Sequence, residues 1–196
     1  MKIVLLESLG IPAELLKSYA DKLEAKGHTF AAYEKNTDAQ VQIDRAKDAD
    51  VIMIANMPLK GEVIRACKNL KFINVAFTGV DHVDLAAAKE MGVKVSNASG
   101  YSTQSVAELA LGMMLSLLRN VPQVEERCRA GKTKDGLVGT ELRGKTVGIV
   151  GAGAIGQNTG RLCKAFGCKV IAYNHRPKQA AEGTIDEFVD LDTLTR

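Results

Sequence analysis

The 196-residue sequence lacks an excess of charge of either sign. Its 26 lysine and arginine residues stand against 23 aspartate and glutamate residues, which gives a formal net charge of +3. No basic run is dense enough to form a patch that would attract a polyanion. We therefore expect no nucleic-acid partner.

Long apolar runs are also missing. The run at 2–6 is interrupted by Glu7 and is shorter than the roughly 7–15 apolar residues of a secretion signal, so it predicts a first strand. The most apolar helix candidate, 106–118, contains Glu108 and is shorter than the about 20 residues that span a bilayer. We expect no membrane association.

Cysteines are few, and their spacing is not that of a metal or redox motif. None of the four forms a C-x-x-C pair, and no secretory context accompanies them. This usage is typical of reduced thiols in a cytoplasmic protein. No cluster of metal-ligand residues is visible, so we expect no metal site. The cysteines are Cys67, Cys128, Cys163 and Cys168.

What the first hundred residues do contain is an alternation of short apolar runs and amphipathic segments. The runs 51–55 and 72–77 are almost wholly apolar, which is typical of strands buried on both faces of a parallel sheet. Five such repeats predict an α/β domain of flavodoxin-like type over residues 1–98. Strands are expected at 2–6, 30–34, 50–56, 72–77 and 93–97, with helices opened by Pro12 and across 39–47, 60–67 and 84–90.

Small polar residues at 97–103 indicate a hinge, and we place a second domain at 99–196. A helix is expected over 102–119, with Ser105 and Glu108 at capping-box spacing. Apolar residues cover nearly its whole circumference, which predicts burial on all sides, between two domains or in a subunit interface.

A strand, a glycine turn and a helix follow at 146–166. In the G-x-G-x-x-G pattern, Gly151 permits the tight turn, Gly153 lets the backbone approach a diphosphate, and Gly156 brings helix and strand together. The helix N-terminus supplies N–H groups and positive dipole. Inside a βαβ unit, this pattern predicts a partial Rossmann domain, a doubly wound parallel sheet that binds a dinucleotide.

The residue that would contact the ribose should lie about 20 residues beyond the turn. The sequence has Asn174 there, followed by His175 and Arg176. Asparagine lacks the charge that would repel a 2′-phosphate, and Arg176 could bind that phosphate with two hydrogen bonds. Alternatively, Asn174 bonds the ribose hydroxyls and Arg176 lies in solvent. NAD and NADP therefore stay equally open.

Four motifs, in this order and spacing, resemble the D-isomer-specific 2-hydroxyacid dehydrogenase family, and the resemblance covers essentially the whole chain. It implies a substrate domain followed by a nicotinamide domain, hydride transfer between a 2-keto acid and an (R)-2-hydroxy acid, and a homodimer. The motifs are VAFTGVDHVDL (75–85), SVAELALGMML (105–115), LRGKTVGIVGAGAIG (142–156) and FGCKVIAY (166–173).

The resemblance also implies roles for particular residues. Gly79 and Val80 would meet the substrate carboxylate, and Asn56 would lie in a second wall of the pocket. Thr78 and Thr103 would lie near the nicotinamide, although turn and cap chemistry explains them as well. The implied substrate residues are Asn56, Thr78, Gly79 and Val80, and the implied coenzyme residues are Thr103, Gly151, Gly153, Ala154, Ile155, Gly156, Asn174, His175 and Arg176.

Hydride transfer also needs an acid to protonate the alkoxide and a cation to anchor the carboxylate. The resemblance implies an arginine, a glutamate and a histidine from a later part of the nucleotide domain, beyond Arg196. We therefore assign no catalytic residue, and expect residues 1–196 to be the inactive front portion of a longer chain. His82 is expected to be a surface turn residue, Asp81 a turn former and Asp84 a helix cap.

Two other functions compete with this one. A non-catalytic NAD(P)-binding sensor or corepressor-like protein would use the same fold without turnover. A short-chain reductase is disfavoured because such enzymes place the glycine turn near the N-terminus, whereas here it begins at Gly151.

Overall fold

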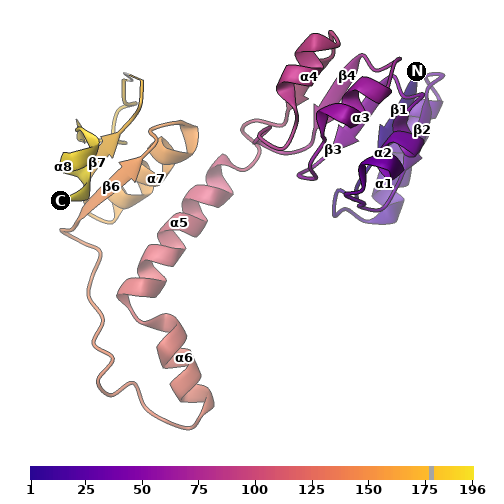
Figure 1. Ribbon diagram of the computed structural model, residues 1–196. Coiled ribbons are helices and arrows are strands. Elements are labelled where there is room, and N and C mark those ends of the chain that lie inside the picture. The colour runs from indigo at the N-terminus through magenta and orange to yellow at the C-terminus, as the bar shows by residue number, and fades with distance from the viewer. Residues whose placement is uncertain (177–178) are drawn as a thin grey trace. The chain divides into compact units, whose positions relative to one another are not determined.

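The computed structural model describes residues 1–176 and 179–196. The chain divides into two compact units, unit 1 at Met1–Ser99 and unit 2 at Gly100–Arg196. In each unit a parallel sheet is combined with helices (Figure 1). The α/β class expected from the sequence is therefore confirmed.

Unit 1 is built on a five-stranded sheet in the order β2-β1-β3-β4-β5, with all neighbours parallel. This order is the flavodoxin-like one that the alternating pattern predicted. Its elements are β1 (Lys2–Leu5), α1 (Ala13–Glu24), β2 (Thr29–Ala32), α2 (Ala39–Ala46), β3 (Val51–Ile54), α3 (Gly61–Ala66), β4 (Phe72–Val75), α4 (Leu85–Glu90) and β5 (Lys94–Asn97).

The helices of unit 1 divide between the two faces of the sheet. The chain adds β2 on one side of β1 and then β3, β4 and β5 in turn on the other side. Because parallel crossovers are right-handed, this change of direction puts α1 on one face of the sheet and α2, α3 and α4 on the other. Helix α3 packs against both α2 and α4 (Figure 1). The fully buried core lies on this second face and includes Val4, Ile52, Ile54, Ile64, Ile73 and Val75.

The expectation that β3 and β4 are buried on both faces is wrong within this chain. Alternate residues are buried and half-buried along each strand, as at Ile52 and Met53. The face toward α1 is covered incompletely, because α1 buries none of its own residues and leaves Leu15 and Tyr19 exposed. Apolar composition therefore overstated the burial of these strands.

Unit 2 contains a three-stranded parallel sheet in the order β6-β7-β8, with the glycine-turn strand β6 at its edge. Helix α7 makes the crossover between β6 and β7. The elements are α5 (Thr103–Leu118), α6 (Val121–Arg129), β6 (Thr146–Val150), α7 (Ala154–Ala165), β7 (Lys169–Tyr173), β8 (Glu187–Phe188) and α8 (Leu191–Thr195).

Helix α7 is held close to its neighbours by glycines. A Cβ built on Gly160 would lie 2.2 Å from the carbonyl oxygen of Thr184, so only glycine fits there without displacing backbone. Helix α5 packs along α7 and contributes Leu111 to the core of the unit. That core also contains Leu142, Ile149, Ala152, Cys163, Cys168, Val170 and Ala172.

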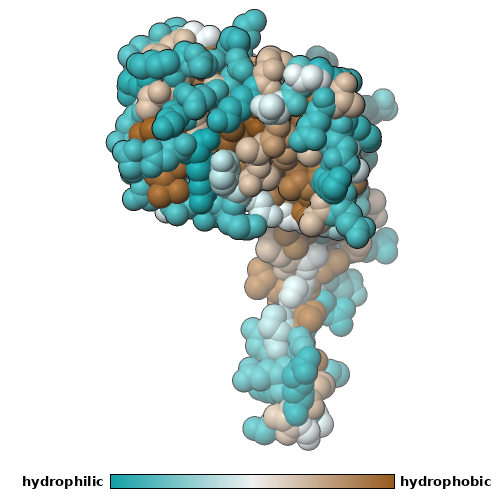
Figure 2. Space-filling view, turned by 90° about the vertical axis from the view of Figure 1, so that its right-hand side faces the viewer, coloured by the Kyte–Doolittle hydropathy of each residue, from teal (hydrophilic) through white to brown (hydrophobic). Residues whose placement is uncertain are grey.

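The burial predicted for helix α5, between two domains or in a subunit interface, stays a prediction, because a single chain covers only one side of the helix. Only Ala107 and Leu111 are buried, and one face stays exposed in this chain, with Leu109 at 62% and Leu117 at 75%. In Figure 2, apolar side chains are uncovered on the part of the surface where α5 lies. No described helix is long and apolar enough to cross a bilayer.

The predicted capping box at the start of α5 does not form. The helix begins at Thr103, with Ser102 as its N-cap and no side-chain capping bond. The Ser105 hydroxyl instead donates to the Ser102 carbonyl, and the Glu108 carboxylate accepts from the side chain of Gln104. The helix starts three residues earlier than the box required, so both residues lie inside it.

Replacing Gly160 with alanine should destabilise unit 2. The new methyl group would collide with the Thr184 carbonyl, and such overpacking costs about 1–3 kcal/mol of unfolding free energy. Gly112→Ala is the matched control, because a Cβ on that α5 glycine meets nothing within 4 Å and should stabilise the helix by about 0.5–1 kcal/mol. Thermal unfolding of both variants measures this, and equal midpoints would contradict the close approach at Gly160.

Candidate functional site

The glycine turn is closed by backbone contacts that exclude side chains. Gly151 has φ +96°, a conformation that favours glycine, and its N–H donates to the Tyr173 carbonyl at 2.8 Å. A Cβ on Gly156 would lie 2.2 Å from the Gly151 carbonyl oxygen and 3.1 Å from Cγ2 of Ile149. The turn can therefore fold this tightly only with glycine at 156.

The turn leads directly into the N-terminus of α7. Gly153 is the N-cap and offers no side chain to the first turn of the helix. The N–H groups of Ala154 and Ile155 belong to that first turn, where no intrahelical acceptor exists. Ala154 is exposed and Ile155 half-buried. The helix thus presents N–H donors and positive dipole toward an incoming anion.

Asn174, the predicted ribose-contacting residue, is bonded to the turn. Its Oδ1 accepts from the N–H of Ala152 at 3.0 Å, and its Nδ2 donates to the carbonyl of Arg176 at 2.6 Å. The end of β7 is therefore fastened to the glycine turn by one side chain. His175 and Arg176 are exposed beside it, so their side chains remain accessible to a ligand at this edge.

Thr103, from the predicted hinge, and Ala154, from the glycine turn, line one groove of unit 2. The groove lies along the first turns of α5 and α7, and the Asn158 amide donates to Oε1 of Gln104 at 2.7 Å across it. Its lining residues are Gly100, Tyr101, Thr103, Gln104, Ala154, Gln157, Asn158 and Arg161.

Sequence reasoning missed the polar residues of this groove. Ala154, Gln157, Asn158 and Arg161 recur at the spacing of one helical face. The signal in the sequence is the polar stripe that Gln157, Asn158 and Arg161 form on the glycine-turn helix. Arg161 donates to Oδ1 of Asn158 at 3.3 Å, which brings a cation to the groove.

In unit 1, the predicted substrate residues follow two neighbouring strands. Asn56 lies just after β3, and 78–80 lie just after β4. Because β3 and β4 are parallel neighbours, both loops meet at the same edge of the sheet. A bridge between Leu59 and Val83 ties the two loops together further on. The structure therefore brings Asn56 and Thr78–Val80 to one edge.

The loop after β4 offers backbone groups at this edge. The Thr78 carbonyl accepts from Nδ2 of Asn97 at 2.6 Å, which ties the loop to the end of β5. Gly79 and Val80 are half-buried, and their N–H groups have no acceptor among the described residues. Such paired donors suit a carboxylate.

The polar residues that follow this loop mainly stabilise the fold. Asp84 caps α4, since its carboxylate accepts from the N–H of Ala87 at 2.8 Å, as predicted. His82 differs from the surface residue expected. It is half-buried, its carbonyl accepts from the N–H of Leu59, and its Nε2 is buried with no partner among the described residues.

Glu7 is a second residue that sequence reasoning overlooked. Its side chain is only 4% exposed, and its Oε1 accepts from the N–H groups of Ala55 and Met57, each at 2.7 Å. A carboxylate directly after a buried strand was the available signal.

None of the buried cysteines is activated as a nucleophile. Burial raises the pKa of the Cys67 thiol to about 11 and also raises the pKa of Cys163 and of Cys168. Cys128 is the exposed one. Within the described residues, no group of metal ligands was found either.

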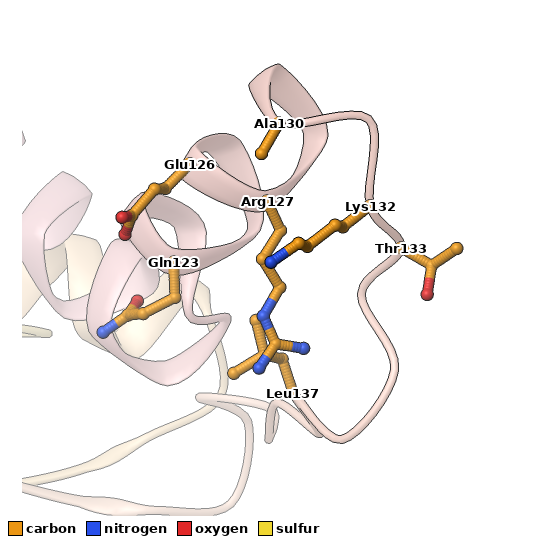
Figure 3. A pocket seen from close by; sticks show the side chains of 7 residues that line it. All are labelled: Gln123, Glu126, Arg127, Ala130, Lys132, Thr133 and Leu137. Carbon is orange, nitrogen blue, oxygen red and sulfur yellow. The ribbon is translucent and has the colours of Figure 1, made fainter.

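A separate hollow lies between α6 and the loop that follows it (Figure 3). Arg127 and Lys132 extend into it, whereas Thr133 points outward, and Arg127 donates to the Asp135 carbonyl. None of the predicted site residues belongs to it. The lining consists of Gln123, Glu126, Arg127, Ala130, Lys132, Thr133 and Leu137.

These features define an α/β protein with a dinucleotide-type glycine turn inside a βαβ unit. The chain belongs to the D-isomer specific 2-hydroxyacid dehydrogenase family, since the model of that family's catalytic domain matches residues 3–194. A hydroxypyruvate reductase of Thermotoga maritima is 42% identical over 149 residues, covering 75% of this chain and 48% of the reductase. This chain thus spans about half the length of that relative.

Solved structures resemble the whole of this chain. An NAD-dependent formate dehydrogenase from Staphylococcus aureus, in complex with NAD, superposes with a TM-score of 0.87 at 30% identity, over 100% of this chain and 62% of that one. An acyclic imino acid reductase in complex with NADPH and D-Arg gives a TM-score of 0.86 at 27% identity, over 99% and 62%.

The cysteines should react with a thiol reagent in two classes. At pH 8 a thiol with a raised pKa stays protonated and unreactive, because the thiolate is the nucleophile. We expect Cys128 alone to react quickly with Ellman's reagent in the native protein, and all four cysteines to react in guanidinium chloride. Cys128→Ser should abolish the fast phase, and a fast phase that persists in that variant would contradict the burial of the others.

Proposed function

We propose that this protein is an NAD(P)-dependent oxidoreductase that interconverts a 2-keto acid and an (R)-2-hydroxy acid by hydride transfer. The observation that carries the proposal is the glycine turn that opens α7 inside a βαβ unit, in a chain of this dehydrogenase family. A coenzyme diphosphate would accept hydrogen bonds from the N–H groups at that helix N-terminus.

In this proposal the two halves of the chain divide the work. Residues 99–196 bind the nicotinamide coenzyme, which is supported by the groove that Thr103 shares with Ala154. Residues 1–98 bind the small acid, which is supported by the meeting of the loops after β3 and β4 at one sheet edge. The coenzyme residues are Thr103, Gly151, Gly153, Ala154, Ile155, Gly156, Asn174, His175 and Arg176, and the substrate residues are Asn56, Thr78, Gly79 and Val80.

The coenzyme is NAD or NADP. Asn174 carries no charge that would repel a 2′-phosphate, and the exposed Arg176 could pair with one. Because the amide of Asn174 is already bonded to Ala152 and Arg176, the groups left for ribose binding are the second lone pair of Oδ1 and the second N–H of Nδ2. The two similar structures held NAD and NADPH respectively, so neither coenzyme is favoured.

We further propose that residues 1–196 supply binding groups and not the proton donor of the reaction. An acid must protonate the alkoxide as hydride arrives. Of the three histidines, His28 lies beside the N-terminal amine, His175 at the ribose end, and the Nε2 of His82 is enclosed. Bound coenzyme would therefore not turn over on this polypeptide by itself.

The exposed face of α5 supports a homodimer. Val106, Leu109, Met113 and Leu117 lie along one side of the helix and are 40–75% exposed. A stripe of this kind is typical of a surface that another protein covers. A second copy of the chain, related by a twofold axis, would bury the stripe against itself. We also infer a cytoplasmic setting, since the cysteines are unpaired.

Coenzyme titration tests the proposed turn directly. Gly153→Ala should weaken NADH or NADPH binding about tenfold or more, because the methyl group projects where the diphosphate would approach, while folding is spared since a Cβ there meets nothing within 4 Å. Arg176→Ala should weaken NADPH alone if the protein uses NADP. Coenzyme fluorescence measures both, with Gly112→Ala as the control. Absence of affinity for either coenzyme in the wild type would refute the proposal.

Turnover separates the enzyme from the sensor alternative. The natural protein should oxidise NADH or NADPH in the presence of glyoxylate, pyruvate or hydroxypyruvate, as absorbance at the nicotinamide band reports. The polypeptide 1–196 alone should bind coenzyme without oxidising it. Coenzyme binding by the natural protein without turnover on any 2-keto acid would favour a sensor, and turnover by 1–196 would overturn the assignment of the proton donor.

The dimer has its own test. Leu117→Glu should convert a dimer into a monomer, because a carboxylate would have to be buried in the apolar stripe at a cost of several kcal/mol. Leu15→Glu, at an exposed leucine of α1, is the matched control and should stay dimeric. Light scattering coupled to size exclusion gives the masses, and a monomeric wild type at micromolar concentration would refute the interface.

A further inference from the structure

The loop that carries Asn56 is held by two buried polar side chains from other elements. Glu7 follows β1 and Gln42 lies in α2, and as whole residues they are 3% and 1% exposed. Neither belongs to the predicted site. Burying a carboxylate and an amide is costly unless their hydrogen bonds are made inside the protein, so their bonding partners indicate what they do.

Glu7 holds the N–H groups on either side of Asn56. Its Oε1 accepts from Ala55 and from Met57 at 2.7 Å each, which are short bonds to a charged acceptor. The other carboxylate oxygen lies 4.0 Å from Nζ of Lys35. Because both flanking peptides are bonded to one oxygen atom, the backbone at Asn56 has little freedom to rotate.

Gln42 holds the other side of the same loop. Its Nε2 donates to the carbonyls of Asn36 at 2.9 Å and Pro58 at 3.4 Å, and it contacts Sδ of Met57 at 3.6 Å. Met57 is fully buried, whereas Asn56 and Pro58 are exposed. The loop is thus fixed through its backbone and through Met57, with Asn56 turned outward at the sheet edge.

We propose that Glu7 and Gln42 are positioning residues that set the orientation of Asn56 in the substrate pocket. This inference rests on the proposed function, since it assigns Asn56 to the pocket wall. It goes beyond that function by naming two residues that need not touch the substrate and yet determine its binding. Loosening the loop should weaken binding of the 2-keto acid and leave the coenzyme half of the chain unaffected.

The test compares variants of the natural protein in steady-state kinetics and coenzyme titration. Glu7→Leu removes both acceptors at similar volume and should raise the KM for the 2-keto acid about tenfold, with kcat changed less and coenzyme Kd within about twofold. Glu7→Gln keeps an acceptor oxygen and should restore most of the loss. Gln42→Met removes the amide donor and should shift KM in the same direction, which keeps the test open if Glu7→Leu does not fold.

Asp50→Asn is the matched control. Asp50 also accepts a backbone N–H, from Lys2 at 2.8 Å, but it precedes β3 and so lies at the opposite sheet edge. This variant should lower the melting temperature and leave KM unchanged. Hydrogen exchange at the amides of Ala55 and Met57 should accelerate in Glu7→Leu, much less in Glu7→Gln, and not in Asp50→Asn.

The outcomes separate the inference from the proposed function. A wild type that turns over normally, with Glu7→Leu and Gln42→Met unchanged in KM, would overturn the positioning role and leave the dehydrogenase intact. An equal rise in KM in Asp50→Asn would overturn it too, because general destabilisation would then explain the effect. A wild type without turnover on any 2-keto acid would remove both proposals together.

Discussion

The contact between the Gly151 carbonyl and the bare Cα of Gly156 is the constraint on which unit 2 depends. Because no side chain intervenes, β6 turns into α7 within a few residues and the helix begins against the strand that precedes it. Gly160 repeats this at the next turn of the helix, against Thr184. The first N–H groups of α7 are consequently fixed at the sheet edge, where an anion can meet them.

In unit 1, buried polar side chains fix the backbone of a loop at the candidate pocket. This pocket is made of loops, which are usually the most mobile parts of a fold. Parallel pairing of β3 and β4 brings the loops to one edge, and the bonds from Glu7 and Gln42 fix the first of them. The buried carboxylate is therefore tied to loop geometry, whereas the apolar core beneath it requires only volume and patterning.

Sequence reasoning erred where it inferred burial from apolar composition alone. Strands β3 and β4 were predicted to be buried on both faces because apolar residues dominate them. In the structure, β3 alternates between buried and half-buried residues. Apolar composition shows that a segment can be buried. Whether it is buried depends on which other elements pack against it, in the same chain or in a second copy.

The sequence by itself determined the α/β class, the flavodoxin-like order of unit 1 and the glycine turn, because backbone geometry and burial periods are local properties that leave a pattern in neighbouring residues. Only the tertiary structure decided that Asn174 bonds to the turn at Ala152 and that Glu7 accepts hydrogen bonds from the loop around Asn56. Those bonds join residues 22 and 50 positions apart, and no local pattern specifies which distant N–H a buried oxygen atom will meet.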